Sequence, residues 1–196
     1  MKITRIGGKK RVQRRKRRAY SPILDILKRE GGILLSNNTL LDFGIGTNTR
    51  AIAAIARAAR LEKPLGMSEI DIAIENELKT NCTLVLRDGI SYPATWEDTS
   101  SLELYYCSDG GFFVIREVES LSDGWISSYT VKKNIDDVVE KLNSALEMWA
   151  DRLAEHSTLE VPGAEESGEL AEELRRSKYT REDIEKALAN KLTILG

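Results

Sequence analysis

The 196-residue sequence is poor in the residues that most often build metal sites and disulfide frameworks. It contains one histidine, His156, and two cysteines, Cys82 and Cys107. A zinc site with the usual number of ligands cannot be assembled from these three residues. Both cysteines lie in apolar stretches typical of strands, so we expect two reduced thiols in the core. The sequence predicts neither a metal nor a cofactor.

Long hydrophobic runs are also missing. The longest candidate, residues 51–56, ends at Arg57, so no segment approaches the length that spans a bilayer. The basic N-terminal stretch leads into Pro22 rather than into a long apolar core, which is not the pattern of a secretory signal. We therefore expect no membrane contact and a cytoplasmic location, with the nucleus of a eukaryote or a virion as alternatives.

Acidic residues are absent from the beginning of the chain, where the first one is Asp25. The first 18 positions hold ten of the 29 lysine and arginine residues. The rest of the chain therefore carries 19 basic and 31 acidic residues, a formal charge of −12. The formal net charge of −2 thus combines a cationic arm, residues 1–20, with an acidic body.

The basic arm is predicted to bind the phosphate backbone of nucleic acid. Such segments bind DNA or RNA by displacing condensed counterions, and arginine adds a planar fork of donors. No face of the arm is reserved for a core, so it should be disordered until a polyanion orders it. No zinc-finger spacing or RNA-recognition motif accompanies it, so we expect contact without base specificity. The predicted contact residues are Lys9, Lys10, Arg11, Arg14, Arg15, Lys16, Arg17 and Arg18.

Other uses of a basic arm remain open. A targeting signal, binding to anionic lipid and a solvated tail would each suit its composition. Three further arginines, Arg50, Arg57 and Arg60, fall on one side of a predicted helix and could extend a basic surface onto the body. An ordinary solvated helix face explains them more simply.

Residues 21–156 are predicted to form an α+β domain with a mostly antiparallel sheet and covering helices. A helix should start at Ser21-Pro22 and end at Gly31-Gly32. Two further helices are expected at about 47–61 and 69–79. Short strands are expected at 33–35 and 39–43, around an asparagine-containing turn.

The second half of this domain is predicted to form several strands followed by one long helix. Asp88-Gly89 predicts a hairpin between strands 83–86 and 90–92, and the turn 108–111 predicts a second one. A last strand is expected at 125–131. Asn134 then begins a helix of about five turns with one broad apolar stripe, which indicates a core helix lying across a sheet.

The C-terminal part is predicted to be an acidic linker, 157–179, and an amphipathic helix, 180–196. The linker prediction rests on six acidic and no basic residues between 157 and 173, with Pro162, Gly163 and Gly168 among them. The helix should begin at Thr180, with Asp183 completing a variant of the capping box. Its short apolar stripe predicts docking, either onto its own body or onto another subunit.

One glycine-rich segment, Leu40–Thr47, suggests an enzyme. Its apolar stretch, acidic residue and G-x-G turn resemble the first motif of class I S-adenosylmethionine-dependent methyltransferases. The resemblance implies that Asp42, Gly44 and Gly46 line a cofactor pocket. It also implies that Asp71 binds the ribose and that Asp88 lies near the adenine. Asn48 stands at the third glycine position, and residues 82–131 lack the crossovers of a parallel sheet. A tight turn followed by a helix cap is the alternative interpretation.

The sequence therefore favours a non-enzymatic, nucleic-acid-associated structural or accessory protein. A component of a virion, a ribonucleoprotein or a mobile element would fit equally well. A catalytic relay built on His156, the only histidine, is not expected. The alternatives are the methyltransferase-like enzyme and an acidic protein-binding module, such as an inhibitor or immunity factor, because an acidic surface can neutralise a basic partner.

Overall fold

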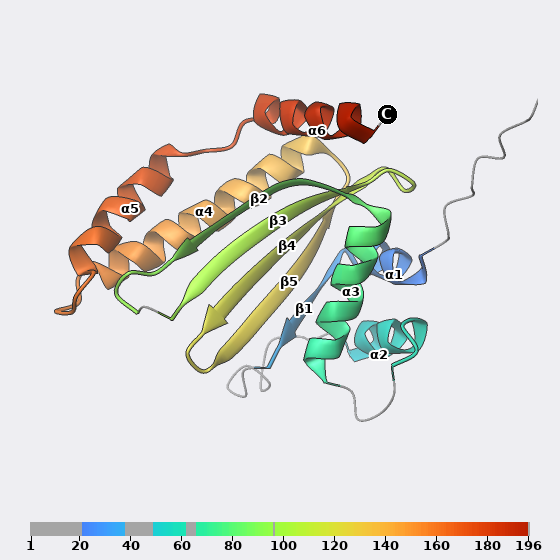
Figure 1. The fold of residues 1–196 in the computed structure, drawn as a ribbon, viewed down its shortest axis with the longest axis horizontal. Helices are drawn as coiled ribbons and strands as arrows, with labels where there is room; N and C mark the ends of the chain where they lie inside the picture. The colour runs from blue at the N-terminus through green and yellow to red at the C-terminus, as the bar shows by residue number, and fades with distance from the viewer. Residues whose placement is uncertain (1–20, 38–48, 62–65, 96, 196) are drawn as a thin grey trace, which may run out of the picture.

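The computed structural model describes residues 21–37, 49–61, 66–95 and 97–195 (Figure 1). Within them, six helices and five strands follow one another along the chain. They are α1 (Pro22–Glu30), β1 (Gly32–Ser36), α2 (Thr49–Ala58), α3 (Met67–Asn81), β2 (Thr83–Ser91), β3 (Thr99–Cys107), β4 (Phe112–Leu121), β5 (Gly124–Lys132), α4 (Ile135–His156), α5 (Ala164–Arg176) and α6 (Arg181–Leu195).

The strands form one antiparallel sheet in the order β1-β5-β4-β3-β2. The four strands β2 to β5 make a meander, each pairing with the next. β1 completes the sheet by pairing with β5, although about 90 residues separate them in sequence. This arrangement confirms the predicted α+β class and its antiparallel sheet. The predicted strand 39–43 lies outside the described residues.

Both faces of the sheet are apolar where helices cover them, and strand alternation assigns each residue to a face. In β3, Tyr105 and Cys107 point to a core shared with α1, α2 and α3, whereas Leu102 and Leu104 point to α4. Figure 1 shows α3 crossing the strands with α1 and α2 beside it, and α4 running along the other side of the sheet. The domain therefore has three layers, with the sheet in the middle.

A buried ionic cluster fastens α3 to the sheet. Arg116 on β4 binds Asp71 on α3 at 2.8 Å, and its guanidinium lies 3.5 Å from Glu103 on β3. Tyr129 donates to Asp71 at 2.6 Å and Tyr105 donates to Glu103 at 2.8 Å. Burial raises the pKa of Glu103, but the hydrogen bonds from Tyr105 and Arg87 outweigh it, so its pKa lies below the ordinary value.

The helix starts predicted at Ser21, Asn134 and Thr180 are confirmed, whereas α3 begins at Met67, before the predicted start at Ser68. The Ser21 side chain accepts from the backbone N–H of Leu24, and Asn134 accepts from that of Asp137. Thr180 and Asp183 form the reciprocal capping pair at the start of α6, with the Thr180 N–H donating to Asp183 at 2.8 Å. The helix predicted at 69–79 is present as α3.

The hairpin predicted at Asp88-Gly89 is wrong, because β2 continues through both residues. Asp88 pairs with Leu102 and Gly89 with Ser101, and the chain turns later, where the Tyr92 N–H donates to the Asp98 carbonyl at 3.0 Å. A Cβ on Gly89 would lie 3.0 Å from the carbonyl oxygen of Ser100. The glycine therefore allows close strand pairing instead of forming a turn.

The prediction of an acidic linker is also wrong where α5 forms. Ser167 and Ala171 are buried against the body, and the acidic residues occupy the outer face of the helix. The inward face consists largely of small side chains, which have no strong hydrophobic periodicity in sequence. Gly163 precedes the helix with φ +86°, and a Cβ there would lie 2.5 Å from the carbonyl oxygen of Pro93.

The expected reduced thiols are instead a disulfide between Cys82 and Cys107. Cys82 is the C-cap residue that follows α3, Cys107 is the last residue of β3, and their Cα atoms are 4.3 Å apart. They meet because Thr83 pairs with Tyr106 in the β2–β3 register. A hairpin at Asp88-Gly89 would pair residues 83–86 with residues 90–92 instead of with β3. The predicted hairpin therefore concealed the proximity of the two cysteines.

The C-terminal helix docks onto its own body. Ile184 is fully buried in the cluster that α4 forms with the sheet, and Ala187 and Leu188 pack beside it. Before the helix, Asn143 on α4 accepts from the backbone N–H of Tyr179 at 2.8 Å. Leu192, further along α6, is 44% exposed. The beginning of α6 is therefore an integral part of the fold.

Removing the disulfide should lower stability without changing the fold. The bridge closes a loop with a sequence separation of 25 residues, for which chain entropy predicts about 3.5 kcal/mol. The free energy of unfolding of the variant Cys82→Ala/Cys107→Ala should be lower by that amount, so the variant should unfold at a lower urea concentration. A reductant should lower the melting temperature of the unaltered protein and leave that of the variant unchanged. No response of the unaltered protein to reductant would contradict the disulfide.

Shortening Ile184 tests the docking of α6. Ile184→Ala should destabilise the protein by about 2–4 kcal/mol, because it leaves a cavity in a fully buried site. The matched change Leu192→Ala should cost less than about 1 kcal/mol. Urea unfolding gives both values, and light scattering should show the same mass for both variants. A change in mass would instead indicate that α6 bridges subunits.

Candidate functional site

The described surface is hollowed between α4 and the sheet. We call this region the α4 groove; it consists of two adjoining hollows of about 630 and 240 Å³ that share Glu119 and Met148. The groove exists because α4 packs on the part of the sheet formed by β2, β3 and β4. Leu34 on β1 and Ile126 and Ser128 on β5 then form part of the floor beside the helix.

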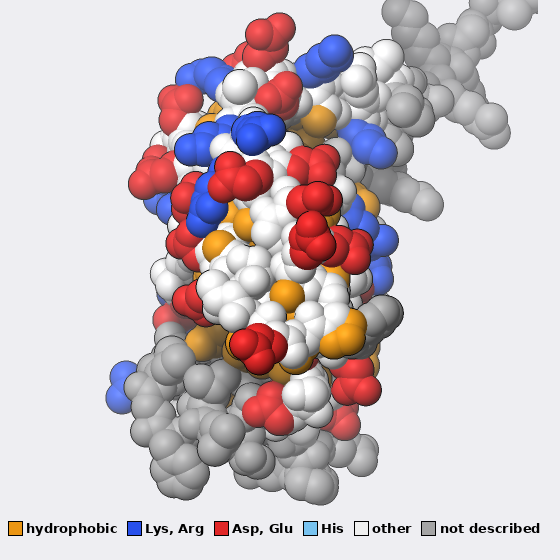
Figure 2. Space-filling view, turned by 90° about the vertical axis from the view of Figure 1, so that its left-hand side faces the viewer, with side chains coloured by type: hydrophobic (Ala, Val, Ile, Leu, Met, Phe, Trp, Pro, Cys, Tyr) orange, Lys and Arg blue, Asp and Glu red, His pale blue; other side chains and the backbone are white. Residues whose placement is uncertain are grey.

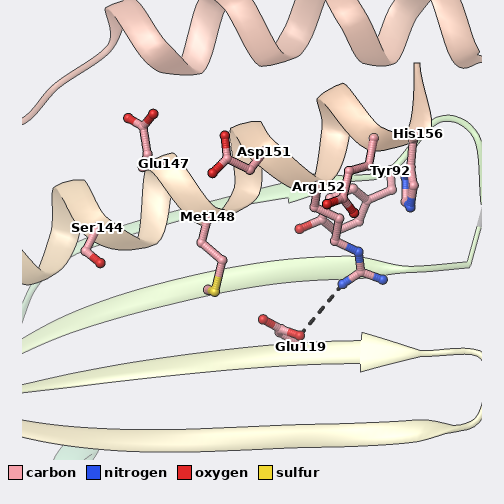
Figure 3. A pocket seen from close by; sticks show the side chains of 9 residues that line it. Tyr92, Glu119, Ser144, Glu147, Met148, Asp151, Arg152 and His156 are labelled. Carbon is pink, nitrogen blue, oxygen red and sulfur yellow. Dashed lines mark ion pairs between the residues drawn. The ribbon is translucent and has the colours of Figure 1, made fainter. Parts of the chain in front are cut away.

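The larger hollow is organised around Arg152 on α4 (Figure 3). The guanidinium binds Asp98 at 2.7 Å, lies 3.7 Å from Glu119 and stacks over the Tyr92 ring, 4.3 Å from its centre. Figure 3 shows Arg152 and Met148 between the helix and the sheet. Arg152 therefore joins α4 to β4 and to the turn that links β2 and β3.

Tyr92 and His156 close the end of this hollow. The Tyr92 hydroxyl and the Ser100 hydroxyl are hydrogen-bonded at 2.9 Å, and burial raises the pKa of Tyr92. The His156 ring meets the Tyr92 ring edge to face, with centres 5.5 Å apart. The Nδ1 atom of His156 is buried and has no hydrogen-bond partner among the described residues. The two rings form an aromatic wall at the end of the hollow.

The smaller hollow contains a carboxylate with one unused oxygen. Glu117 is 9% exposed, and its Oε2 atom binds Lys141 at 2.7 Å and accepts from Ser128 at 3.2 Å. Its Oε1 atom has no hydrogen-bond partner in the part of the chain that the structure describes. Trp149 and Val118 line the same hollow. The smaller hollow thus combines apolar walls with a buried carboxylate whose hydrogen-bonding capacity is only partly used.

The groove is acidic as a whole. Five acidic and two basic side chains line it, and the exposed Glu147 and Glu155 stand on its helical rim. The acidic residues are Glu117, Glu119, Glu147, Asp151 and Glu155. Such a lining favours a ligand with several N–H donors or positive charges. No group of three potential metal ligands occurs within the described ranges.

The residues predicted to contact nucleic acid lie outside the described residues. These are Lys9, Lys10, Arg11, Arg14, Arg15, Lys16, Arg17 and Arg18. Asp42, Gly44 and Gly46 lie outside them as well. Arg50 and Arg57 on α2 are exposed, and so is Arg60, which follows the helix, as the interpretation of a solvated surface requires.

The remaining features of the methyltransferase resemblance do not form a cofactor pocket. Asp71 lies within α3 and binds Arg116, and Asp88 lies within β2 and accepts from the Tyr179 hydroxyl at 2.8 Å. All strand pairs of the described sheet are antiparallel, whereas that fold requires parallel strands. The implied placement of Asp71 and Asp88 is therefore wrong.

Apart from His156, the residues of the α4 groove carry no motif that marks them in the sequence. A partial signal was present, because Glu117 and Glu119 occupy the same face of β4 as the apolar Phe113 and Ile115. A change from apolar to acidic along one strand face marks the place where the covering helix no longer excludes polar groups. No family model, curated protein or solved structure matches this chain.

Replacing Arg152 tests its role in holding the groove together. Arg152→Met should destabilise the protein by about 1–3 kcal/mol, because it removes the ion pair of the buried Asp98. Arg176→Met is the matched control; Arg176 is 80% exposed and should change stability by less than about 0.5 kcal/mol. Urea unfolding measures both effects. Equal stability of the two variants would show that Arg152 does not join the elements.

Proposed function

We propose that this chain is a non-enzymatic, nucleic-acid-associated structural or accessory protein. Its basic arm would bind the phosphate backbone, and its folded body would provide the attachment to other components. The observation that carries the proposal is the separation of charge, with ten basic and no acidic residues in the first 18 positions. Binding would be strongly salt-dependent and indifferent to base sequence.

The beginning of the folded part supports an arm that acts separately from the body. Ser21 caps α1, and its hydroxyl donates to Glu77 on α3 at 2.7 Å. The three core clusters together contain residues from every described helix and strand. A body anchored at Ser21 can keep its fold while the arm changes partners.

The disulfide favours one of the three settings considered for such a protein. Disulfides persist in virions and other oxidising environments and are rare in the reducing cytoplasm. The Cys82–Cys107 bridge therefore supports a virion component over a ribonucleoprotein that remains in the cytoplasm. None of the described helices has the length and apolar character needed to cross a bilayer.

A second candidate function rests on the acidic body. Figure 2 shows acidic side chains spread over the end of the molecule near α5, whereas lysine and arginine gather in the upper half of that view. Such a surface could bind a basic protein, as an inhibitor or immunity module does. Protein binding through the exposed part of α6, which includes Leu192, is also a proposal.

Deleting residues 1–18 should abolish binding to both DNA and RNA. The melting temperature should change little, because Ser21 and the core clusters remain. If about six to eight phosphates are neutralised, log K of the full chain should fall with log salt with a slope of about −5 to −7. Fluorescence anisotropy measures both properties. A flat salt dependence, or full binding by the shortened chain, would contradict the proposal.

A further inference from the structure

We propose that the α4 groove is a docking site for the basic arm of the same chain, occupied when no polyanion is bound. This inference rests on the proposed function only in one respect, namely that nucleic acid displaces the arm from the groove. The contact between arm and groove can be tested without nucleic acid.

Charge complementarity is the first argument. The arm carries ten positive charges in 18 residues, and five of the seven charged residues that line the groove are acidic. The two basic residues of the groove are already paired, Lys141 with Glu117 and Arg152 with Asp98. Glu147 and Glu155, which are exposed on the rim, have no ion pair among the described residues and can receive further cations.

The unused oxygen of Glu117 is an independent argument. A buried carboxylate oxygen without a hydrogen bond is costly, and the Oε1 atom of Glu117 is buried and unpartnered in the described part of the chain. Glu117 lines the smaller hollow, so a rotation of its carboxylate would bring this oxygen to a donor bound there. An arginine fork supplies several N–H donors to carboxylates. The arm contains six arginines, so it offers many such donors.

The apolar walls fit the stems of the same side chains. Met148 is 47% exposed and lies in both hollows, and Trp149 and Ile126 line the smaller one. Lysine and arginine cover apolar surface with their methylene stems while their charged ends reach polar groups. A groove with an apolar floor and an acidic rim suits a basic peptide segment better than it suits a nucleic acid.

The arm is long enough to reach the groove. In Figure 1, α1 begins near one end of the sheet and α4 finishes near the other. The second half of α4 lines the larger hollow, so the arm must cross the length of the sheet to reach it. The 22-residue α4 is about 33 Å long. Twenty extended residues span up to about 66 Å. A docked arm would compete with polyanions, so that only a dense row of phosphates would release it.

Zero-length cross-linking of the full chain tests the contact directly. A carbodiimide joins lysine amines to carboxylates that touch them. We expect cross-links from Lys9, Lys10 or Lys16 to Glu119, Glu147 or Glu155, identified by mass spectrometry. They should disappear when excess nucleic acid is added. Mixing isotopically labelled and unlabelled chains distinguishes an arm of the same chain from that of a second copy.

A matched pair of variants tests the competition. Glu119→Gln/Glu155→Gln removes two groove charges, whereas Glu169→Gln/Glu182→Gln removes two exposed charges on α5 and α6. Release of the arm should raise the apparent affinity for nucleic acid about threefold to tenfold in the groove variant only. Equal affinities of the two variants would overturn the competition.

The failure of this inference and that of the proposed function are distinguishable. Groove cross-links within one chain, without nucleic-acid binding, would support the docking and contradict the proposed function. Nucleic-acid binding without groove cross-links would support the proposed function and contradict the docking. Cross-links only to acidic residues outside the groove, or only between two chains, would overturn the docking to the chain's own groove.

Discussion

The antiparallel pairing of β3 with β4 is the contact on which the rest of the structure depends. Nine consecutive residue pairs join these central strands, from Thr99 with Ser120 to Cys107 with Phe112. This register assigns Tyr105 and Val114 to one face and Leu104 and Ile115 to the other. A slip of one residue would exchange the faces, so both helical layers depend on it.

The charged residues on the two faces of the sheet have different surroundings. On the side of α3, Arg116, Asp71 and Glu103 neutralise one another within a closed interface. On the side of α4, Glu117 and Glu119 lie where the helix leaves part of the sheet uncovered, and the cations there satisfy only some of their acceptors. The first cluster holds the fold together, whereas the second leaves capacity for a ligand.

Charge separation gives the molecule two parts that can attract each other. The described body is held together by its own helices, sheet and disulfide, and the basic arm precedes it. If the arm docks in the α4 groove as proposed, weak polyanions would be disfavoured, because they would compete with an internal partner at high effective concentration. Dense phosphate arrays would overcome that competition. The same physics links the proposed function to the proposed docking site.

The sequence by itself determined the elements whose signals are local. Ser21, Asn134 and Thr180 mark helix starts because their side chains satisfy backbone groups only three residues away. The turn at 108–111 and the stripe of α4 are similarly local, and they were enough to predict the antiparallel sheet and its covering helix. Only the tertiary structure decided the roles of Gly89, the α5 segment and the two cysteines. Gly89 meets the β3 backbone, α5 buries small residues against the body, and Cys82 reaches Cys107 through the β2–β3 register. The α4 groove likewise arises from a helix and strands that are distant in sequence. Such contacts depend on which surfaces meet after folding, and local sequence patterns do not contain that information.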